Sequence, residues 1–507
     1  MNQRKAGAII SYISFFFTII TGLLYTPYML RMMGQSEYGI NHTAASLTAY
    51  LSLLSFGVGG AYLRFVSQCR AKKDLEAEKS LNGAFLLIFA ILGTVALICG
   101  AGIIAFAGVL VEKTFTDREL VRLQIVMVFG VLNMALTFLF NPIMMAIQSK
   151  ERYLFLRGVN LAASIIQPII NVVALYFGGK AIAITVISFV ISVILFILYL
   201  IYAVKVLEFS FTFKGIKFSL LKEVFIFSSF LFLGSITEQI TNSTDNVVLG
   251  AVSGTTAVAI YAVGAQFKNY FMNFSTAISN VFSVQVNTLV AEGKDAELNH
   301  LFVRVGRIQF YVLALFMIGF GTIGYDFVCI WAGRDYDQAY LIAMLLMLAI
   351  FVPLFQNVGL EIQKAKNKHK ARSIVYLLIA VANLAMTIPM SMKWGGVGAA
   401  LATMISMFVG AVLFMNYYYQ KYIGLDIIGF WKSIFSIVPS LLPSIAVGFV
   451  LHRYWDLNSY WRILVAALAI LVTYMLFVWL FSMNSYEKDL VRSPVRKILN
   501  KKVARGK

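Results

Sequence analysis

MGQSEYGI, at residues 33–40, opens a pattern that occurs twice in this chain and decides its fold. An apolar helix follows it, and then comes KDLEAEKSLNGA at residues 73–84. About 221 residues later, SGTTAVAIYAV (253–263) again precedes an apolar helix and then KDAELNHLFV (294–303). The chain therefore contains the same helical unit in two copies.

Two further pairs of segments extend the match. AIQSKE (146–151) corresponds to EIQKAK (361–366), and YFGGKAIAITVIS (176–188) corresponds to KWGGVGAALATMIS (393–406). A doubled bundle of membrane helices is the usual build of a transporter, whose substrate site lies at the interface between the copies.

Composition places the chain in a membrane. Of its 507 residues, 60% are hydrophobic and 13% are charged, and the mean hydropathy is +0.82. A soluble domain would carry about 25% charged residues. Apolar runs of about 20 residues, each long enough to cross a bilayer, recur along the chain. The first run, residues 8–30, has no small-residue cleavage site, so we expect a retained span rather than a signal peptide.

We predict an all-α integral membrane protein with about 14 transmembrane helices, arranged as two parallel six-helix repeats plus two C-terminal helices. The expected boundaries are an N-lobe at 1–204, a cytoplasmic linker at 205–223, a C-lobe at 224–419, helices 13 and 14 at 420–483 and a basic tail at 484–507. Because most lysines and arginines fall on one side, both termini should be cytoplasmic. The net charge of +19 is thus a topology signal and does not indicate nucleic acid.

Cations inside the predicted spans are candidates for binding an anionic substrate. Arg64 and Lys268 lie within predicted spans, and Arg31 closes the first one. A guanidinium fork suits phosphate oxygens. The alternative for each arginine is an anchor at a helix end, and Lys268 could instead extend its ammonium to the interface.

The second copy also carries polar stripes at helical spacing. Asn269, Asn273 and Asn280 share one face and could hold sugar hydroxyls, or they could bond neighbouring helices. Glu238, Asn242 and Asp245 share a face of the preceding span. Two carboxylates on such a face could bind H⁺ or Na⁺, and the alternative is a structural polar seam.

Motifs for other chemistry do not stand out. We find no P-loop, catalytic triad or zinc motif, and the spacing of Cys69, Cys99 and Cys329 fits no metal site. We therefore expect no enzyme activity, no cofactor and no metal site.

The N-terminal stretch IISYISFFFTIITGLLYTPYMLRMMGQSEYGI (9–40), with the arginine of AYLRF (61–65), resembles the polysaccharide flippases of the multidrug/oligosaccharidyl-lipid/polysaccharide (MOP) exporter superfamily. TDNVVLGAVSGTTAVAIYAV (244–263) and VFSVQVNTLVAEG (281–293) resemble them as well. Val284 and Gln285 are a departure, because such proteins often have a proline there. The resemblance implies a bacterial inner-membrane flippase for undecaprenyl-diphosphate-linked oligosaccharides, with two lobes in a V around a cavity lined by helices 1, 2, 7 and 8.

We thus expect a flippase that works by alternating access, coupled to H⁺, Na⁺ or the membrane potential. Arg64, Lys268 and Arg31 would attract the diphosphate, the asparagines would contact sugars, and Asp245, Glu238 and Asn242 would couple the cycle to ions. Its partners would be the lipid-linked substrate, membrane lipids and a polysaccharide polymerase. Three alternatives stay open: a peptidoglycan-precursor flippase, a multidrug/cation antiporter of the same superfamily, and a membrane glycan polymerase or ligase.

Overall fold

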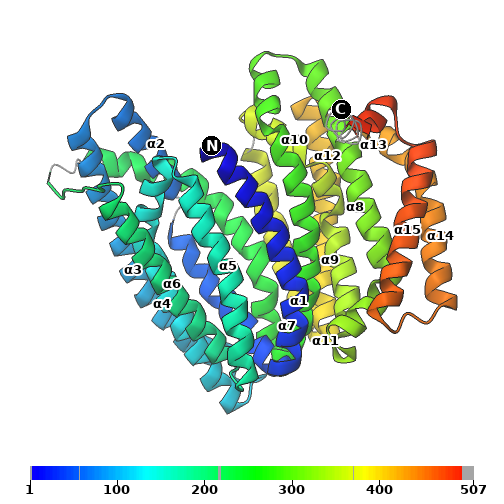
Figure 1. Cartoon of the computed structure of the whole chain (residues 1–507), viewed down its shortest axis with the longest axis horizontal. Coiled ribbons are helices and arrows are strands. Elements are labelled where there is room, and N and C mark those ends of the chain that lie inside the picture. Colours follow the sequence, from blue (N-terminus) through cyan, green and yellow to red (C-terminus); the bar gives the residue numbers. More distant parts are fainter. Residues whose placement is uncertain (1–2, 56–57, 215–217, 369, 491, 494–507) are drawn as a thin grey trace, which may run out of the picture. The chain divides into compact units, whose positions relative to one another are not determined.

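A computed structural model describes residues 3–55, 58–214, 218–368, 370–490 and 492–493, and for part of residues 3–16 and 218–242 it describes the backbone only. Within these ranges every regular element is helical (Figure 1). In chain order they are α1 (Gln3–Ala49), η1 (Tyr50–Ser55), α2 (Val58–Ala71), α3 (Leu75–Val111), α4 (Asp117–Ser149), α5 (Tyr153–Tyr176), α6 (Ala181–Lys205), α7 (Phe218–Ala291), α8 (Asp295–Trp331), η2 (Arg334–Tyr336), α9 (Gln338–Phe355), α10 (Asn357–Ala365), α11 (Lys370–Met407), η3 (Phe408–Phe414), α12 (Met415–Tyr418), η4 (Tyr419–Ile423), α13 (Ile427–Phe435), α14 (Val438–Tyr454) and α15 (Tyr460–Phe481).

The membrane spans confirm the predicted all-α plan. In the described part of the chain, 10 helical stretches are long and apolar enough to cross a bilayer, and α13 with α14 forms one more span bent by 41°. Three of the stretches turn sharply at Gly34, Gly254 and Gly395, so each of them holds two of the predicted spans. This accounts for about fourteen helices in a multi-pass membrane protein.

Backbone conformation reveals the repeat more sharply than the sequence does. Ten of the described residues with positive φ fall into five pairs separated by 216 to 220 positions. The pairs are Gly34 with Gly254, Lys73 with Gly293, Glu151 with Asn367, Gly178 with Gly395, and Glu208 with Gly424. Left-handed backbone is rare enough that this pairing marks equivalent corners in the two copies. It also moves two of the sequence matches by one residue. In the connection before the third helix, Lys73 corresponds to Gly293 and not to Lys294; after the fourth helix, Glu151 corresponds to Asn367 and not to Lys366.

Two predicted spans are interrupted. The second, expected at 40–66, passes from α1 through η1 before α2 begins at Val58. The tenth, expected at 340–362, breaks at Gln356 between α9 and α10, three residues after Pro353. Proline removes one helical hydrogen bond and clashes with the preceding turn, so it favours a break here. The buried Gln356 side chain donates to Asn416 Oδ1 at 2.8 Å and so remains paired.

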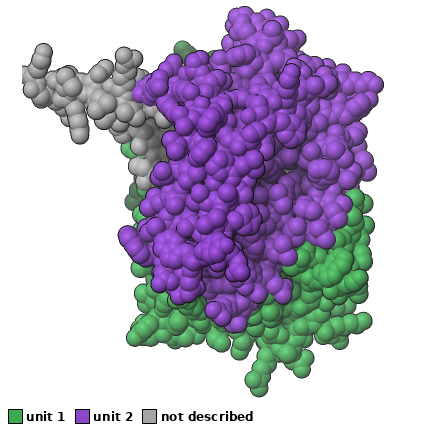
Figure 2. Space-filling view, turned by 90° about the vertical axis from the view of Figure 1, so that its right-hand side faces the viewer, with its two compact units in different colours: residues 1–262, 380–399 green, residues 263–379, 400–507 purple. Residues whose placement is uncertain are grey.

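By their internal contacts the residues fall into two compact units, coloured separately in Figure 2. Unit 1 comprises residues 1–262 and 380–399, and unit 2 comprises residues 263–379 and 400–507. The helices α7 and α11 therefore contribute to both units. The lobe boundaries expected near residues 204 and 224 stay a prediction.

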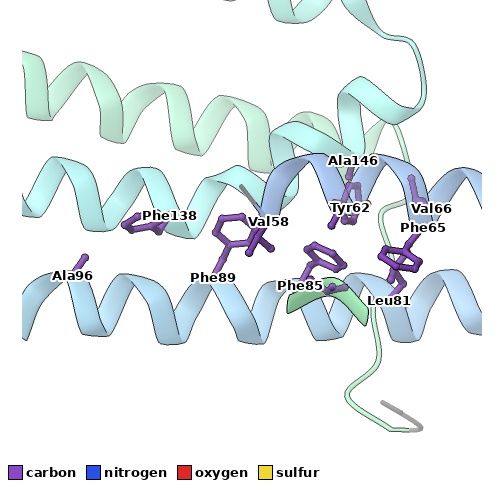
Figure 3. Close-up of a cluster of buried hydrophobic side chains, with 12 residues drawn as sticks. Val58, Tyr62, Phe65, Val66, Leu81, Phe85, Phe89, Ala96, Phe138 and Ala146 are labelled. Carbon is purple, nitrogen blue, oxygen red and sulfur yellow. The ribbon is translucent and has the colours of Figure 1, made fainter. Parts of the chain in front are cut away.

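An aromatic core in unit 1 joins α2, α3 and α4 (Figure 3). The ring of Tyr62 meets that of Phe85 edge to face with centroids 5.1 Å apart, and Phe89 lies beside Phe138. Apolar side chains gain little free energy by moving from lipid into a helix interface, so membrane helices are held together by close packing. This core fixes α2 with Tyr62 and Phe65 buried, which leaves Arg64 on an exposed part of the helix.

In unit 2 the additional C-terminal helices α14 and α15 pack against each other and against α8 (Figure 1). A buried ion pair reinforces this contact: Arg307 of α8 donates from Nε to Glu487 Oε1 at 2.6 Å and from Nη2 to Oε2 at 3.0 Å. Glu487 follows α15, so the ion pair anchors the chain beyond the last span.

Candidate functional site

A polar cluster surrounds the corner at Gly34 in unit 1. Arg122 pairs with the buried Glu37, whose other oxygen accepts from the backbone N–H of Ala181 at 3.3 Å. Glu119 accepts from Thr255 Oγ1 at 3.1 Å and from the hydroxyl of Ser36 at 2.5 Å. The cluster thus ties the corners of both copies to the starts of α4 and α6.

The two corners also touch through their backbones. A methyl group added at Gly39 would lie 2.0 Å from the carbonyl oxygen of Thr255, so only glycine fits there. Thr114 donates to the carbonyl of Gly250 at 2.6 Å, and Ser253 donates to that of Ser391 at 3.2 Å. At this end of unit 1 the helices of the two copies are therefore in direct contact.

Asp245, one of the predicted ion-coupling residues, precedes the Gly254 corner on α7 and is only 4% exposed. Tyr261 donates a short hydrogen bond to its Oδ2, and Thr387 Oγ1 lies 3.5 Å from its Oδ1. The adjacent Thr244 bonds Tyr50 at 2.7 Å. The carboxylate therefore contacts one hydroxyl group from α7 and one from α11. Such oxygen ligands suit a proton or a hard cation.

Glu238 and Asn242, the other predicted ion-coupling residues, lie on the α7 backbone, but their side chains are outside the described part of the structure.

The predicted arginines are exposed and lie apart. Arg31 comes three residues before the Gly34 corner, whereas Arg64 lies towards the other end of the second span, with its guanidinium 5.9 Å from the centre of the Phe65 ring. Both belong to unit 1, and the structure does not bring them into one cluster.

The second half of α7, in unit 2, carries the remaining predicted substrate residues. Asn269 and Asn280 are exposed, while Lys268 and Asn273 are half-buried. A different face of this helix makes the contacts to its neighbours: Gln309 donates to Ser279 Oγ at 2.6 Å and to the carbonyl of Ser275 at 3.1 Å. The exposed asparagines are therefore not the residues that join α7 to α8.

Two cavities were not foreseen from the sequence. One, of about 450 Å³ in unit 1, lies where α2, α4 and α6 end and α3 begins; the charged side chains in its wall are Arg70, Glu78, Lys79, Lys150 and Glu208. The other, of about 190 Å³ in unit 2, lies at the break between α9 and α10, where Arg372 and Tyr376 line it. The described residues contain no group of three or more His, Cys, Asp or Glu side chains placed to hold a metal ion.

Solved structures share this fold. The lipid II flippase MurJ, in an inward closed conformation, is 17% identical, with a TM-score of 0.73 over 96% of this chain and 100% of that one. An inward-facing multidrug resistance transporter of the MATE family, from the MOP superfamily, is 12% identical, with a TM-score of 0.61 over 82% of this chain and 99% of that one. No curated protein matches the chain significantly.

A family model described as "Polysaccharide biosynthesis protein" matches residues 5–284, more than half of the chain. The match covers the whole first copy and the beginning of the second, including Arg31, Arg64, Asp245 and the asparagine face of α7. The chain therefore belongs to the polysaccharide biosynthesis protein family.

Proposed function

We propose that this protein is a flippase that moves an undecaprenyl-diphosphate-linked oligosaccharide across the bacterial cytoplasmic membrane. The observation that carries the proposal is the exposed polar face of α7 formed by Asn269 and Asn280, with the half-buried Lys268 next to Asn269 in the sequence, in a chain of the polysaccharide biosynthesis family. Amides and an ammonium are costly in contact with lipid chains, so this face should line a water-filled path.

The roles of the substrate residues follow from their chemistry. Arg64, Lys268 and Arg31 supply the positive charge that a diphosphate requires, and guanidinium groups suit its oxygens. Asn269, Asn273 and Asn280 offer both donors and acceptors, which match the hydroxyl groups of a sugar. The lipid tail would remain in the bilayer while the head group crosses.

The buried carboxylate of Asp245 is the best candidate for coupling to H⁺ or Na⁺. It bonds Tyr261, and Thr387 of α11 lies nearby. These residues come from α7 before the Gly254 corner, from α7 after it and from α11, so a change in the charge of Asp245 would alter the packing of three segments of unit 1. Protonation or cation binding could thereby favour one conformation over the other. Glu238 and Asn242 would extend this polar face of α7.

The closed corners suggest the conformational cycle. Positive-inside topology puts both termini in the cytoplasm, and it puts the Gly34 and Gly254 corners on the outer side. The contacts of Thr255 with Gly39 and Glu119, and that of Gly250 with Thr114, would then have to separate for the outward-open state. A polymerase that extends the exported glycan would be a natural partner on that side.

A reconstituted assay tests the proposal directly. Purified protein in liposomes would receive a fluorescent lipid-linked oligosaccharide, and its exposure in the outer leaflet would be measured. Replacing both Arg64 and Lys268 by alanine should abolish flipping while the folded protein remains. Lys393→Ala, which removes a cation that lies over Trp394, should leave flipping intact. Normal flipping by the double variant would refute the assignment.

The second candidate is transport of a peptidoglycan precursor, which the similarity in fold to MurJ favours. The same liposomes separate the two functions, because lipid II and a lipid-linked repeat unit without peptide can be compared at equal concentration. Preference for lipid II would replace the first proposal. Preference for an organic cation over both lipids would favour the drug antiporter.

A further inference from the structure

The 450 Å³ cavity of unit 1 lies outside the polar faces assigned to transport. Arg70 comes from the last turn of α2, Glu78 and Lys79 from α3, and Lys150 from the end of α4. Glu208 completes the wall from the connection that follows α6. Positive-inside topology places this end of the helices at the cytoplasmic surface. The volume is typical of a small-molecule site.

The wall of the cavity is fixed by hydrogen bonds. Tyr62 donates to Asn82 at 2.8 Å, and Asn82 in turn donates to the carbonyl of Ser210 at 2.8 Å. Thr212 donates its N–H to the carbonyl of Lys79 at 3.0 Å. A methyl group at Gly83 would lie 2.0 Å from the Thr212 carbonyl oxygen. The connection after α6 is therefore docked on α3, and the cavity is formed before any ligand arrives.

Lys150 has a structural counterpart in the second copy. Its Nζ donates to the carbonyl of Leu207, at the end of α6. Lys366, 216 positions later, donates from Nζ to the carbonyl of Ile423, the residue 216 positions after Leu207, at 3.1 Å. In both copies a lysine at the end of the fourth helix thus bonds the end of the sixth.

The two lysines differ in their counter-charge. Lys366 also pairs with Asp295, the first residue of α8, at 2.7 Å. The equivalent first residue of α3 is Leu75, which lines the cavity and is 70% exposed. Arg70 is already paired with Glu78 at 2.6 Å. The carboxylate that neutralises the lysine in the second copy is therefore replaced in the first by a leucine beside an open cavity.

Electrostatics agree with this comparison. Burial lowers the pKa of Lys150 and the nearby Arg70 guanidinium lowers it further, whereas the Glu78 and Glu208 carboxylates act in the opposite direction. Two cations that repel each other across a cavity gain most from an added anion.

We propose that this cavity binds a phosphate group at the cytoplasmic surface, with Lys150 as its main counter-charge and Arg70 and Lys79 beside it. The phosphate belongs either to an anionic phospholipid head group or to a soluble phosphorylated molecule. Glu208 and Asn82 would contact hydroxyl groups attached to the phosphate. The bound anion fills the place that Asp295 holds in the second copy, and it stabilises the docked segment at residues 207–212. This site is independent of what the transporter carries.

Binding measurements on the full-length protein test the proposal in two arms. In the first, protein in phosphatidylcholine nanodiscs is titrated calorimetrically with inorganic pyrophosphate. In the second, native mass spectrometry counts phosphatidylglycerol retained by the protein against phosphatidylcholine. Binding in the first arm identifies a soluble phosphate as the source, and selective retention in the second identifies a head group. Failure of both arms refutes the proposal.

Three variants locate the binding. Leu75→Asp supplies the carboxylate of the second copy while Lys150 stays in place, and it should weaken binding about tenfold or more. Lys150→Gln should weaken it to a similar degree. Lys366→Gln removes the equivalent lysine from the second copy and should leave binding unchanged. Undiminished binding by Leu75→Asp, or an equal loss in Lys366→Gln, would show that the anion does not occupy this cavity.

Discussion

The ion pair between Arg307 and Glu487 offers the sharpest test of how the C-terminal part is held. The two side chains are 10% and 2% exposed, and the guanidinium donates to both carboxylate oxygens. Glu487→Ala would leave a buried charge without its partner, which typically costs about 3–5 kcal/mol. Four neutral acceptors would remain for the guanidinium, namely the carbonyl oxygens of Ser433 and Ser482 and the hydroxyls of Ser433 and Tyr311. We therefore expect a loss near the lower limit, about 3 kcal/mol.

The assay is unfolding of the purified protein in detergent, followed by fluorescence as the temperature rises. A matched control exists in the same unit, because Asp326 of α8 pairs with His452 of α14 at 2.7 Å, but there the side chains are 25% and 42% exposed. Exposed pairs contribute about 0–1 kcal/mol, so Asp326→Ala should shift unfolding little. The double variant Arg307→Met with Glu487→Leu should recover most of the loss, since it leaves no buried charge. Equal shifts for Glu487→Ala and Asp326→Ala would refute the reasoning.

Three further changes probe the corners and the ion site. Gly39→Ala places a methyl group 2.0 Å from the Thr255 carbonyl oxygen, so the corners should not close. Flipping in the liposome assay should then fall at least tenfold. The control is Gly102→Ala, at a glycine with open space around it, and this variant should flip the lipid normally. Asp245→Asn keeps the shape but removes the charge, and transport should lose its dependence on an imposed proton or sodium gradient; a retained dependence would move the coupling site elsewhere. Glu37→Gln weakens the contact of this buried carboxylate with the partly exposed Arg122, and it should lower the free energy of unfolding by about 1–3 kcal/mol. An unchanged unfolding temperature in the thermal assay would contradict a stabilising role for the Glu37 carboxylate.

The sequence predicted the features that depend on local chemistry. Helical periodicity and apolar length identified the spans, because a bilayer demands both. The segments that contain Gly34 and Gly254 were matched as a repeat, but their left-handed turns came only from the structure. In the connection that leads to the third helix of each copy, the sequence match was one residue off. Lys73-Asp74 and Lys294-Asp295 are identical in sequence, but their backbone positions in the repeat differ. The identical residue types misled the match, because the backbone conformation of these residues is visible only in the structure.

Features that depend on distant partners were missed. Glu37 sits in the opening motif, yet its partner Arg122 lies 85 positions away, and no periodicity connects them. The cavity beside Lys150 was missed for the same reason, because α2, α3, α4 and α6 each supply a wall. The asparagine face of α7 was found, but whether it pairs with neighbouring helices or stays exposed is decided by packing against α8, which the sequence does not encode locally.

Comparison of the copies shows where this protein's specificity should lie. Left-handed residues recur at five equivalent corners, and the lysine bond from the fourth helix to the sixth recurs as well, so the two copies share a backbone design. Two carboxylates do not recur: Glu37 corresponds to Ala257, and Asp295 corresponds to Leu75. Backbone geometry tolerates little change because steric limits act on every corner alike. A charge needs only one partner or ligand, so it can change in one copy while the fold persists. Substitutions that exchange these residues between copies should therefore alter binding and coupling before they alter folding.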